Sequence, residues 1–252
     1  MVEWFTLAEE SLKAGNLVLD EDRRNKLVSF FRYLFTENKK ILLFGPSGSG
    51  KSQFIESLNN SVNETLRTHT SRSIKIPITN LPLKFIDTPG HEYYAPDRKR
   101  EIEAFIKNGV EGIINIVSYG YVESEETNSN DVFDHLGNVK GDFLVKNRVN
   151  EINQLNEWLP WVTVNQNVKW IINLINKADV WWDDSKTIRD YYQSGEYGDK
   201  FVYHKQFMRI KNLPYSSIIK PYYNSVGCPK FGERTKAGLK NHFLKEFLAL
   251  LG

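Results

Sequence analysis

The spacing of apolar residues changes once along the chain. Near the N-terminus, apolar side chains follow the i, i+3, i+4, i+7 spacing of an amphipathic helix, at Leu27, Phe30, Phe31 and Leu34. From residue 39 onward they come in short continuous runs, beginning with Ile41–Phe44, which is typical of buried strands. Residues 1–38 are therefore predicted to form an N-terminal helical extension, followed by one domain over 39–252.

Strands and helices are predicted to alternate within that domain. The runs that predict strands are 40–44, 72–79, 83–87, 112–117, 169–175 and 217–223. Helices are expected from Lys51 and from Asp97, and an apolar stripe predicts another near the C-terminus, at Leu239, Phe243, Phe247 and Leu251. This alternation favours an α/β fold with a mostly parallel sheet, in which the neighbouring runs 72–79 and 83–87 pair antiparallel.

Two long polar segments enlarge this plan. The first, near 119–147, is rich in acidic residues, and the second, near 183–214, is rich in tyrosine. Neither segment fits a minimal alternation of strands and helices, so both are interpreted as insertions. Loops of this length inside a compact domain are usually functional or partly disordered.

The amino-acid composition bears on the cellular location of the protein and on its binding partners. The 33 Lys and Arg residues nearly balance the 31 Asp and Glu residues, so no global field attracts DNA or an anionic membrane. Cys228 is the single cysteine, and no apolar run approaches the roughly 18–20 residues of a membrane span, so a cytoplasmic protein is expected. Residues 199–252 hold ten basic and three acidic residues, which we interpret as a solvated face in preference to an RNA or lipid contact.

One segment carries a phosphate-binding motif. Gly45–Ser52 reads Gly-Pro-Ser-Gly-Ser-Gly-Lys-Ser and fits G-x-x-x-x-G-K-[ST], between an apolar strand and a helix. In such a loop the backbone N–H groups surround a phosphate chain, Lys51 reaches the β- and γ-phosphates, and Ser52 is a Mg²⁺ ligand. The predicted nucleotide-binding residues here are Gly45, Ser47, Gly48, Ser49, Gly50, Lys51, Ser52 and Gln53.

Two later motifs identify the nucleotide. Asp87-Thr88-Pro89-Gly90 matches D-x-x-G, and Asn176–Asp179 reads Asn-Lys-Ala-Asp and matches N-K-x-D, each after an apolar strand. With these motifs in this order, the chain resembles the TRAFAC-class GTPases, the group that contains Ras-like and Era-like proteins, over roughly residues 39–250. The resemblance implies a three-layer P-loop G domain with a six-stranded mostly parallel sheet. It also implies that this domain binds GTP and Mg²⁺.

Each motif residue has a chemical role in this interpretation. Asp179 can accept two N–H bonds from guanine N1 and N2, a pattern that adenine does not present. Lys177 can lay its alkyl stem over the base, and Asn176 can tie the neighbouring loops together. Asp87 would hold Mg²⁺ through water, and Gly90 would present its backbone N–H to the γ-phosphate.

The residues expected to act on the attacking water and on Mg²⁺ come from the switch regions. His91 follows Gly90 directly, an arrangement similar to the elongation-factor GTPases, which implies that His91 orients the water; an exposed loop histidine is the alternative. Thr70 is favoured as the switch I ligand of Mg²⁺, with Thr68 and Ser71 as alternatives.

The last element of the G domain contacts guanine O6 through its backbone. Ser225 and Val226 follow the strand predicted to end at Tyr223, and they are the sequence candidates for that contact.

The sequence therefore predicts a GTPase that hydrolyses GTP to GDP and phosphate and acts as a switch. A nucleotide-locked scaffold with little hydrolysis is the alternative, followed by a guanylate-kinase-like or ATP-using P-loop enzyme, because the P-loop alone fits those classes too. A protein effector or a second copy is expected to bind through the switches, the N-terminal extension or the acidic insertion.

Overall fold

The computed structural model describes residues 40–58, 74–78, 81–87, 95–122, 128–164, 167–217, 228 and 230–251. The predicted N-terminal helical extension lies outside the described residues. So do Thr68, Thr70, Ser71, Gly90, His91, Ser225 and Val226.

The described part of the chain forms a six-stranded sheet in the order β2–β3–β1–β4–β5–β6. Its strands are β1 (Lys40–Phe44), β2 (Ile74–Ile78), β3 (Leu81–Asp87), β4 (Gly112–Val117), β5 (Trp170–Ile175) and β6 (Arg209–Pro214). Only the pair β2–β3 is antiparallel, and the other neighbours are parallel. The predicted α/β class and mostly parallel sheet are confirmed.

One strand of the sheet was not predicted. The parallel partner of β5 is Arg209–Pro214, which lies within the segment 183–214 predicted as an insertion. The predicted strand 217–223 lies, after Ser217, outside the described residues. In β6 exposed and half-buried residues alternate over Arg209–Asn212, as expected at the edge of a sheet, whereas β4 and β5 are buried throughout. The continuous apolar pattern therefore locates the central strands and misses this one.

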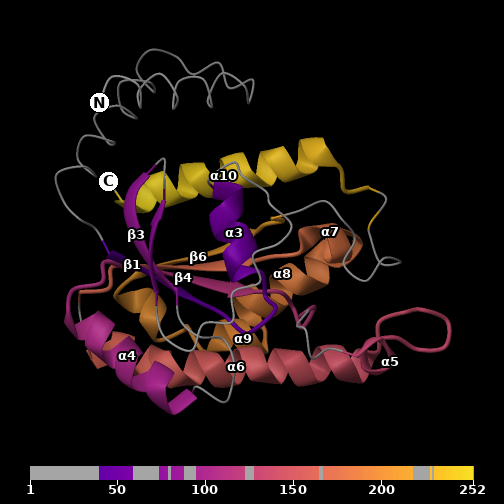
Figure 1. Cartoon of the computed structure of the whole chain (residues 1–252), viewed down its shortest axis with the longest axis horizontal. Coiled ribbons are helices and arrows are strands. Elements are labelled where there is room, and N and C mark those ends of the chain that lie inside the picture. The colour runs from indigo at the N-terminus through magenta and orange to yellow at the C-terminus, as the bar shows by residue number, and fades with distance from the viewer. Residues whose placement is uncertain are drawn as a thin grey trace.

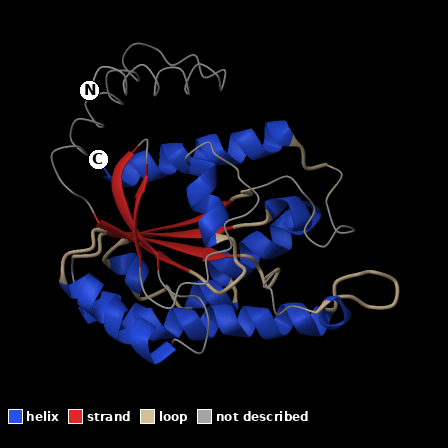
Figure 2. Cartoon of the chain, in the orientation of Figure 1, coloured by secondary structure: helices blue, strands red, loops and turns tan. Residues whose placement is uncertain are grey.

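Helices cover both faces of the sheet (Figures 1 and 2). On one face lie α3 (Lys51–Leu58) and α10 (Glu233–Leu251), whose Phe54, Phe243 and Phe247 pack on alternate residues of β1, β4 and β5. On the other face lie α4 (Ala95–Lys107) and α6 (Gly141–Val164), with α8 (Ser185–Ser194) and α9 (Glu196–Asp199) beside them. Because side chains alternate along a strand, each face receives its own apolar core.

The two segments predicted as insertions contain regular structure. The first holds α5 (Ser129–Val132) and the start of α6, joined by a loop that projects from the body in Figure 1. The second holds α8, α9, two short 3₁₀ turns at Trp182–Asp184 and His204–Gln206, and β6 itself. Its last six residues therefore belong to the sheet.

None of the helices in the described ranges is both long and apolar enough to cross a bilayer.

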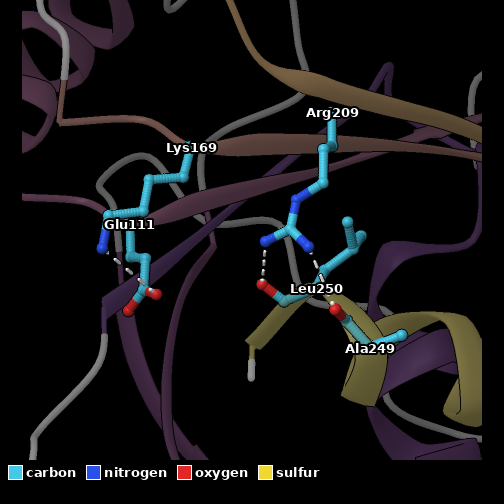
Figure 3. Close-up of polar contacts among 5 residues, drawn as sticks. All are labelled: Glu111, Lys169, Arg209, Ala249 and Leu250. Carbon is cyan, nitrogen blue, oxygen red and sulfur yellow. Dashed lines mark hydrogen bonds and ion pairs between the residues drawn. The ribbon is translucent and has the colours of Figure 1, made fainter.

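Polar contacts stabilise the end of the sheet at which the parallel strands begin. Figure 3 shows the Arg209 guanidinium donating to two carbonyl oxygens at the end of α10, that of Ala249 at 3.1 Å and that of Leu250 at 2.8 Å. Beside it, Lys169 Nζ lies 3.9 Å from the Glu111 carboxylate. A cation at a helix C-terminus satisfies free carbonyls and complements the helix dipole. These contacts thus attach the end of α10 to the start of β6.

Candidate functional site

The loop after β1 has the conformation that its glycines permit. Gly45, Gly48 and Gly50 have φ values of 144°, 74° and 95°. A Cβ on Gly45 would overlap the carbonyl oxygen of Ile116, and one on Gly50 would overlap the side-chain amide of Asn176. The sequence therefore needs glycine here for backbone conformation and for close approach to β4 and to the N-K-x-D loop.

This loop leads into the N-terminus of α3, where backbone N–H groups and the helix dipole favour an anion. Lys51 is the first residue of the helix, and its ammonium donates to the carbonyl oxygens of Gly45 at 2.7 Å and Pro46 at 3.1 Å. The lysine thus folds back over its own loop. Its position fits a phosphate chain lying across the loop.

The side chain of Asn176 joins the strand ends. Its Nδ2 donates to the Ser49 carbonyl oxygen at 2.9 Å, and its Oδ1 accepts the backbone N–H and the hydroxyl of Ser217, both at 3.3 Å. Its backbone N–H donates to the Val117 carbonyl oxygen at 2.7 Å. The loops after β1, β5 and β6 therefore meet at this fully buried side-chain amide, and the backbone of the same residue bonds the end of β4.

Asn176 and Asp179 are the two anchors of the candidate site, and Asp179 is the second of them along the chain. It is only 4% exposed, and its Oδ1 accepts the hydroxyl of Ser216 at 2.5 Å. Its Oδ2 has no hydrogen-bond partner among the residues that the structure describes. Burial raises the pKa of this carboxyl to about 6, against the lowering effect of the Ser216 hydroxyl and of Lys177. A buried acceptor of this kind fits a ligand that supplies N–H donors.

Lys177 connects the two anchors. It has a left-handed backbone, with φ 60° and ψ 35°, and it precedes the short helix α7 (Ala178–Trp181). Its side chain is 1% exposed. The indole N–H of Trp181 donates to the Asn176 carbonyl oxygen at 2.7 Å, which holds the turn closed.

Ser216 and Ser217 are site residues that the sequence interpretation missed. They directly follow β6 and contact Asp179 and Asn176, whereas the sequence candidates Ser225 and Val226 fall outside the described residues. The error began with the strand, because β6 carries charged residues at alternate positions and lacks a continuous apolar run. The sequence held one signal for this strand and these site residues, which is a pair of serines shortly after a segment with charged residues at alternate positions.

The predicted metal ligands lie at the same edge of the sheet. Ser52 is in the first turn of α3, and Asp87 ends β3, where its backbone pairs in register with Leu43 of β1. A hydroxyl and a carboxylate are the hard oxygen donors that Mg²⁺ prefers. The backbone positions of Ser52 and Asp87 thus fit a shared magnesium site beside the phosphate loop.

A family model described as 50S ribosome-binding GTPase matches residues 40–177. No curated protein matches the chain. Among solved structures, the chain is similar to a probable GTP-binding protein engB (15% identity, 84% of this chain and 98% of that chain covered, TM-score 0.46). It is also similar to a small COPII coat GTPase SAR1 from Encephalitozoon cuniculi in complex with GDP (17% identity, 98% and 97% covered, TM-score 0.41). A third is the signal recognition particle receptor SRb-GDP from Chaetomium thermophilum (16% identity, 72% and 91% covered, TM-score 0.41).

Proposed function

This chain belongs to the 50S ribosome-binding GTPase family, and we propose on that basis that it binds GTP with Mg²⁺, hydrolyses it to GDP and phosphate, and acts as a nucleotide-dependent switch. The observation that carries the proposal is the hydrogen bond from Asn176 Nδ2 to the Ser49 carbonyl oxygen, which joins the turn that bears Asp179 to the phosphate loop. A base held by Asp179 would thereby be joined to phosphates held by Lys51.

Guanine selectivity follows from the unsatisfied oxygen of Asp179. Guanine offers N1–H and the N2 amine side by side, so one carboxylate can accept both. Adenine would leave the buried oxygen unpaired, and an unpaired buried acceptor costs about 1–3 kcal/mol or more when charged. The turn at Ser216 and Ser217 contacts both anchors, which favours it over Ser225 and Val226 for the backbone contact to guanine O6.

For hydrolysis, we assign the phosphates to the N–H groups of the loop and to Lys51. Ser52, Asp87 and Thr70 would hold Mg²⁺, which neutralises charge on the β- and γ-phosphate oxygens when it is bound. Gly90 would donate its N–H to the γ-phosphate, and His91 would orient the attacking water. These switch assignments come from the resemblance of the motifs.

A partner is expected to read the nucleotide state, as an effector or a second copy bound through the switches, the N-terminal extension or the acidic insertion. Cytoplasmic location remains part of the proposal, consistent with the single buried Cys228.

Single-turnover hydrolysis tests the proposal against the alternative of a nucleotide-locked scaffold. Protein loaded with γ-labelled GTP is followed with Mg²⁺ and with EDTA, beside Lys51→Ala and His91→Ala. The proposal predicts Mg²⁺-dependent phosphate release, which is slower in His91→Ala at unchanged GTP occupancy. Bound GTP that stays intact would favour the scaffold, and phosphorylation of GMP would favour a kinase.

A further inference from the structure

A buried carboxylate on α6 holds the loop that follows β4. Glu151 Oε1 accepts the backbone N–H groups of Ser118 at 2.9 Å and Gly120 at 3.1 Å, and its Oε2 accepts the hydroxyl of Tyr192 at 2.7 Å. The intervening N–H, that of Tyr119, donates to the same Tyr192 hydroxyl at 2.9 Å. Three consecutive backbone N–H groups are thus satisfied by one carboxylate and its phenol partner, as in an anion-binding nest.

The loop is held in a conformation that an isolated chain would rarely adopt. Tyr119 has a φ of 55°, which is unfavourable for a residue with a bulky side chain. A Cβ on Gly120 would overlap the Leu144 carbonyl oxygen, so the loop backbone lies directly against α6. The Arg148 guanidinium lies 4.5 Å from the centre of the Tyr119 ring. Contacts from α6 and α8 therefore maintain this backbone against its local preference.

Burial makes the carboxylate dependent on these donors. Glu151 is 2% exposed, and burial raises the pKa of its carboxyl, whereas the Ser118 N–H, the Tyr192 hydroxyl, the Gly120 N–H and Arg148 act in the opposite direction. Removing a donor would leave a buried acceptor unpaired and release part of the loop. The carboxylate and the loop thus stabilise each other.

The same loop begins where β4 touches the candidate site. The Ile116 carbonyl oxygen packs against Gly45, and the Val117 carbonyl oxygen accepts the Asn176 N–H. Ser118 is the next residue along the chain. The last two residues of β4 thus support both the phosphate loop and the base-binding loop, and the Glu151 contacts fix their continuation.

We propose that Glu151 and Tyr192 are positioning residues for nucleotide binding, which hold the end of β4 against Gly45 and Asn176 and so slow the release of guanine nucleotide. This inference rests on the proposed function, because it requires that guanine nucleotide binds at this site. Neither side chain touches the nucleotide, and both act through the backbone of residues 118–120.

The test compares two tyrosines of the same cluster. Tyr192→Phe removes the hydroxyl that bonds the loop and Glu151. Tyr197→Phe removes a hydroxyl whose partner among the described residues is the Asn115 side-chain amide. Both residues are fully buried. Tyr192→Phe loses two buried hydrogen bonds, one to the loop and one to Glu151, whereas Tyr197→Phe loses one. We expect fluorescently labelled GDP to dissociate about fivefold faster from Tyr192→Phe than from wild type, and less than about twofold faster from Tyr197→Phe.

Two further measurements separate positioning from stability. The free energy of unfolding of both variants is measured by urea. The amides of residues 118–120 should exchange hydrogen faster in Tyr192→Phe than in Tyr197→Phe, by more than the difference in global stability between the two variants explains. Glu151→Gln keeps the shape but removes the charge from the group that accepts the Ser118 and Gly120 N–H bonds and the Tyr192 hydroxyl, and it should also speed GDP release. Equal GDP release from the two tyrosine variants would overturn this inference while wild type still binds GDP. A wild-type protein that binds no GDP would overturn the proposed function, and this inference with it.

Discussion

Ser216 donates a 2.5 Å hydrogen bond to Asp179 across the ends of two neighbouring strands, although the residues are 37 positions apart in the sequence. The bond fixes one carboxylate oxygen and leaves the other without a partner among the described residues. The carboxylate is therefore oriented before any ligand arrives, which reduces the entropy lost on binding.

Ser216→Ala should weaken GDP binding without unfolding the protein. A hydrogen bond to a charged group contributes about 1.5–3 kcal/mol, so the Kd should rise by about 10- to 100-fold. Titration calorimetry measures the change. Ser194→Ala, which removes an exposed hydroxyl on α8, is the control and should bind GDP like wild type. Equal Kd values for both variants would show that the serine does not organise the carboxylate.

Guanine nucleotide affinity should fall as the pH falls through 6. Burial raises the Asp179 pKa to about 6, and only the ionised form accepts both guanine N–H groups. At pH 5 about a tenth of the carboxyls are ionised, so the GDP Kd should be about tenfold higher than at pH 8. In Ser216→Ala the midpoint should move to higher pH, because the lost hydroxyl lowers this pKa.

The same pKa sets the sign of a stability effect in the nucleotide-free protein. The folded carboxyl binds its proton more tightly than the unfolded one, whose pKa is near 3.8. The contribution of Asp179 to the free energy of unfolding is therefore complete below pH 4 and is lost as the pH rises through 6. Urea unfolding at several pH values measures it, and Asp179→Asn should lack this component.

Gly50→Ala should abolish the connection between the phosphate loop and Asn176. Both Gly50 and Gly137 have positive φ, so alanine is strained at either position, by about 1–2 kcal/mol. A Cβ at Gly50 meets the Asn176 amide, whereas one at Gly137 meets open space. GDP binding should drop by more than about tenfold in Gly50→Ala and stay unchanged in Gly137→Ala. Equal GDP binding by the two variants would contradict this geometry.

Arg209→Ala should lower stability and leave the site intact. Its guanidinium caps the end of α10 at the edge of the sheet opposite to the phosphate loop (Figure 3). The loss should be about 1–2 kcal/mol in the free energy of unfolding, measured by urea, with GDP Kd unchanged. Lys169→Ala, which removes an exposed ion pair of 3.9 Å, should cost less than about 0.5 kcal/mol.

The sequence predicted those parts of the fold in which the local environment restricts the residue types at consecutive positions. Continuous apolar runs located β1, β4 and β5, because strands buried on both faces need apolar residues at every position. The motifs predicted the phosphate loop and the Asn176–Asp179 turn, because backbone conformation and ligand chemistry restrict the residue types there.

Other features depended on tertiary contacts that no local pattern reveals. β6 was missed because an edge strand tolerates Arg209 and Lys211 on its exposed positions. Ser216 and Ser217 were missed with it, since their importance comes from Asn176 and Asp179, which follow β5. Glu151 sits within an amphipathic helix, and its role depends on the loop after β4, which packs on α6 only in the folded chain.

The central claim is that Asp179 selects guanine, and nucleotide specificity tests it most directly. Kd values for GDP, ADP and XDP are measured for wild type and Asp179→Asn at pH 7.5 with Mg²⁺. Wild type should prefer GDP to ADP and XDP by at least about a hundredfold. Asp179→Asn should reverse the GDP–XDP preference, because the asparagine amide donates to the xanthine O2 that replaces the amine. Equal binding of GDP and ADP by wild type, or an unchanged preference in Asp179→Asn, would contradict the account.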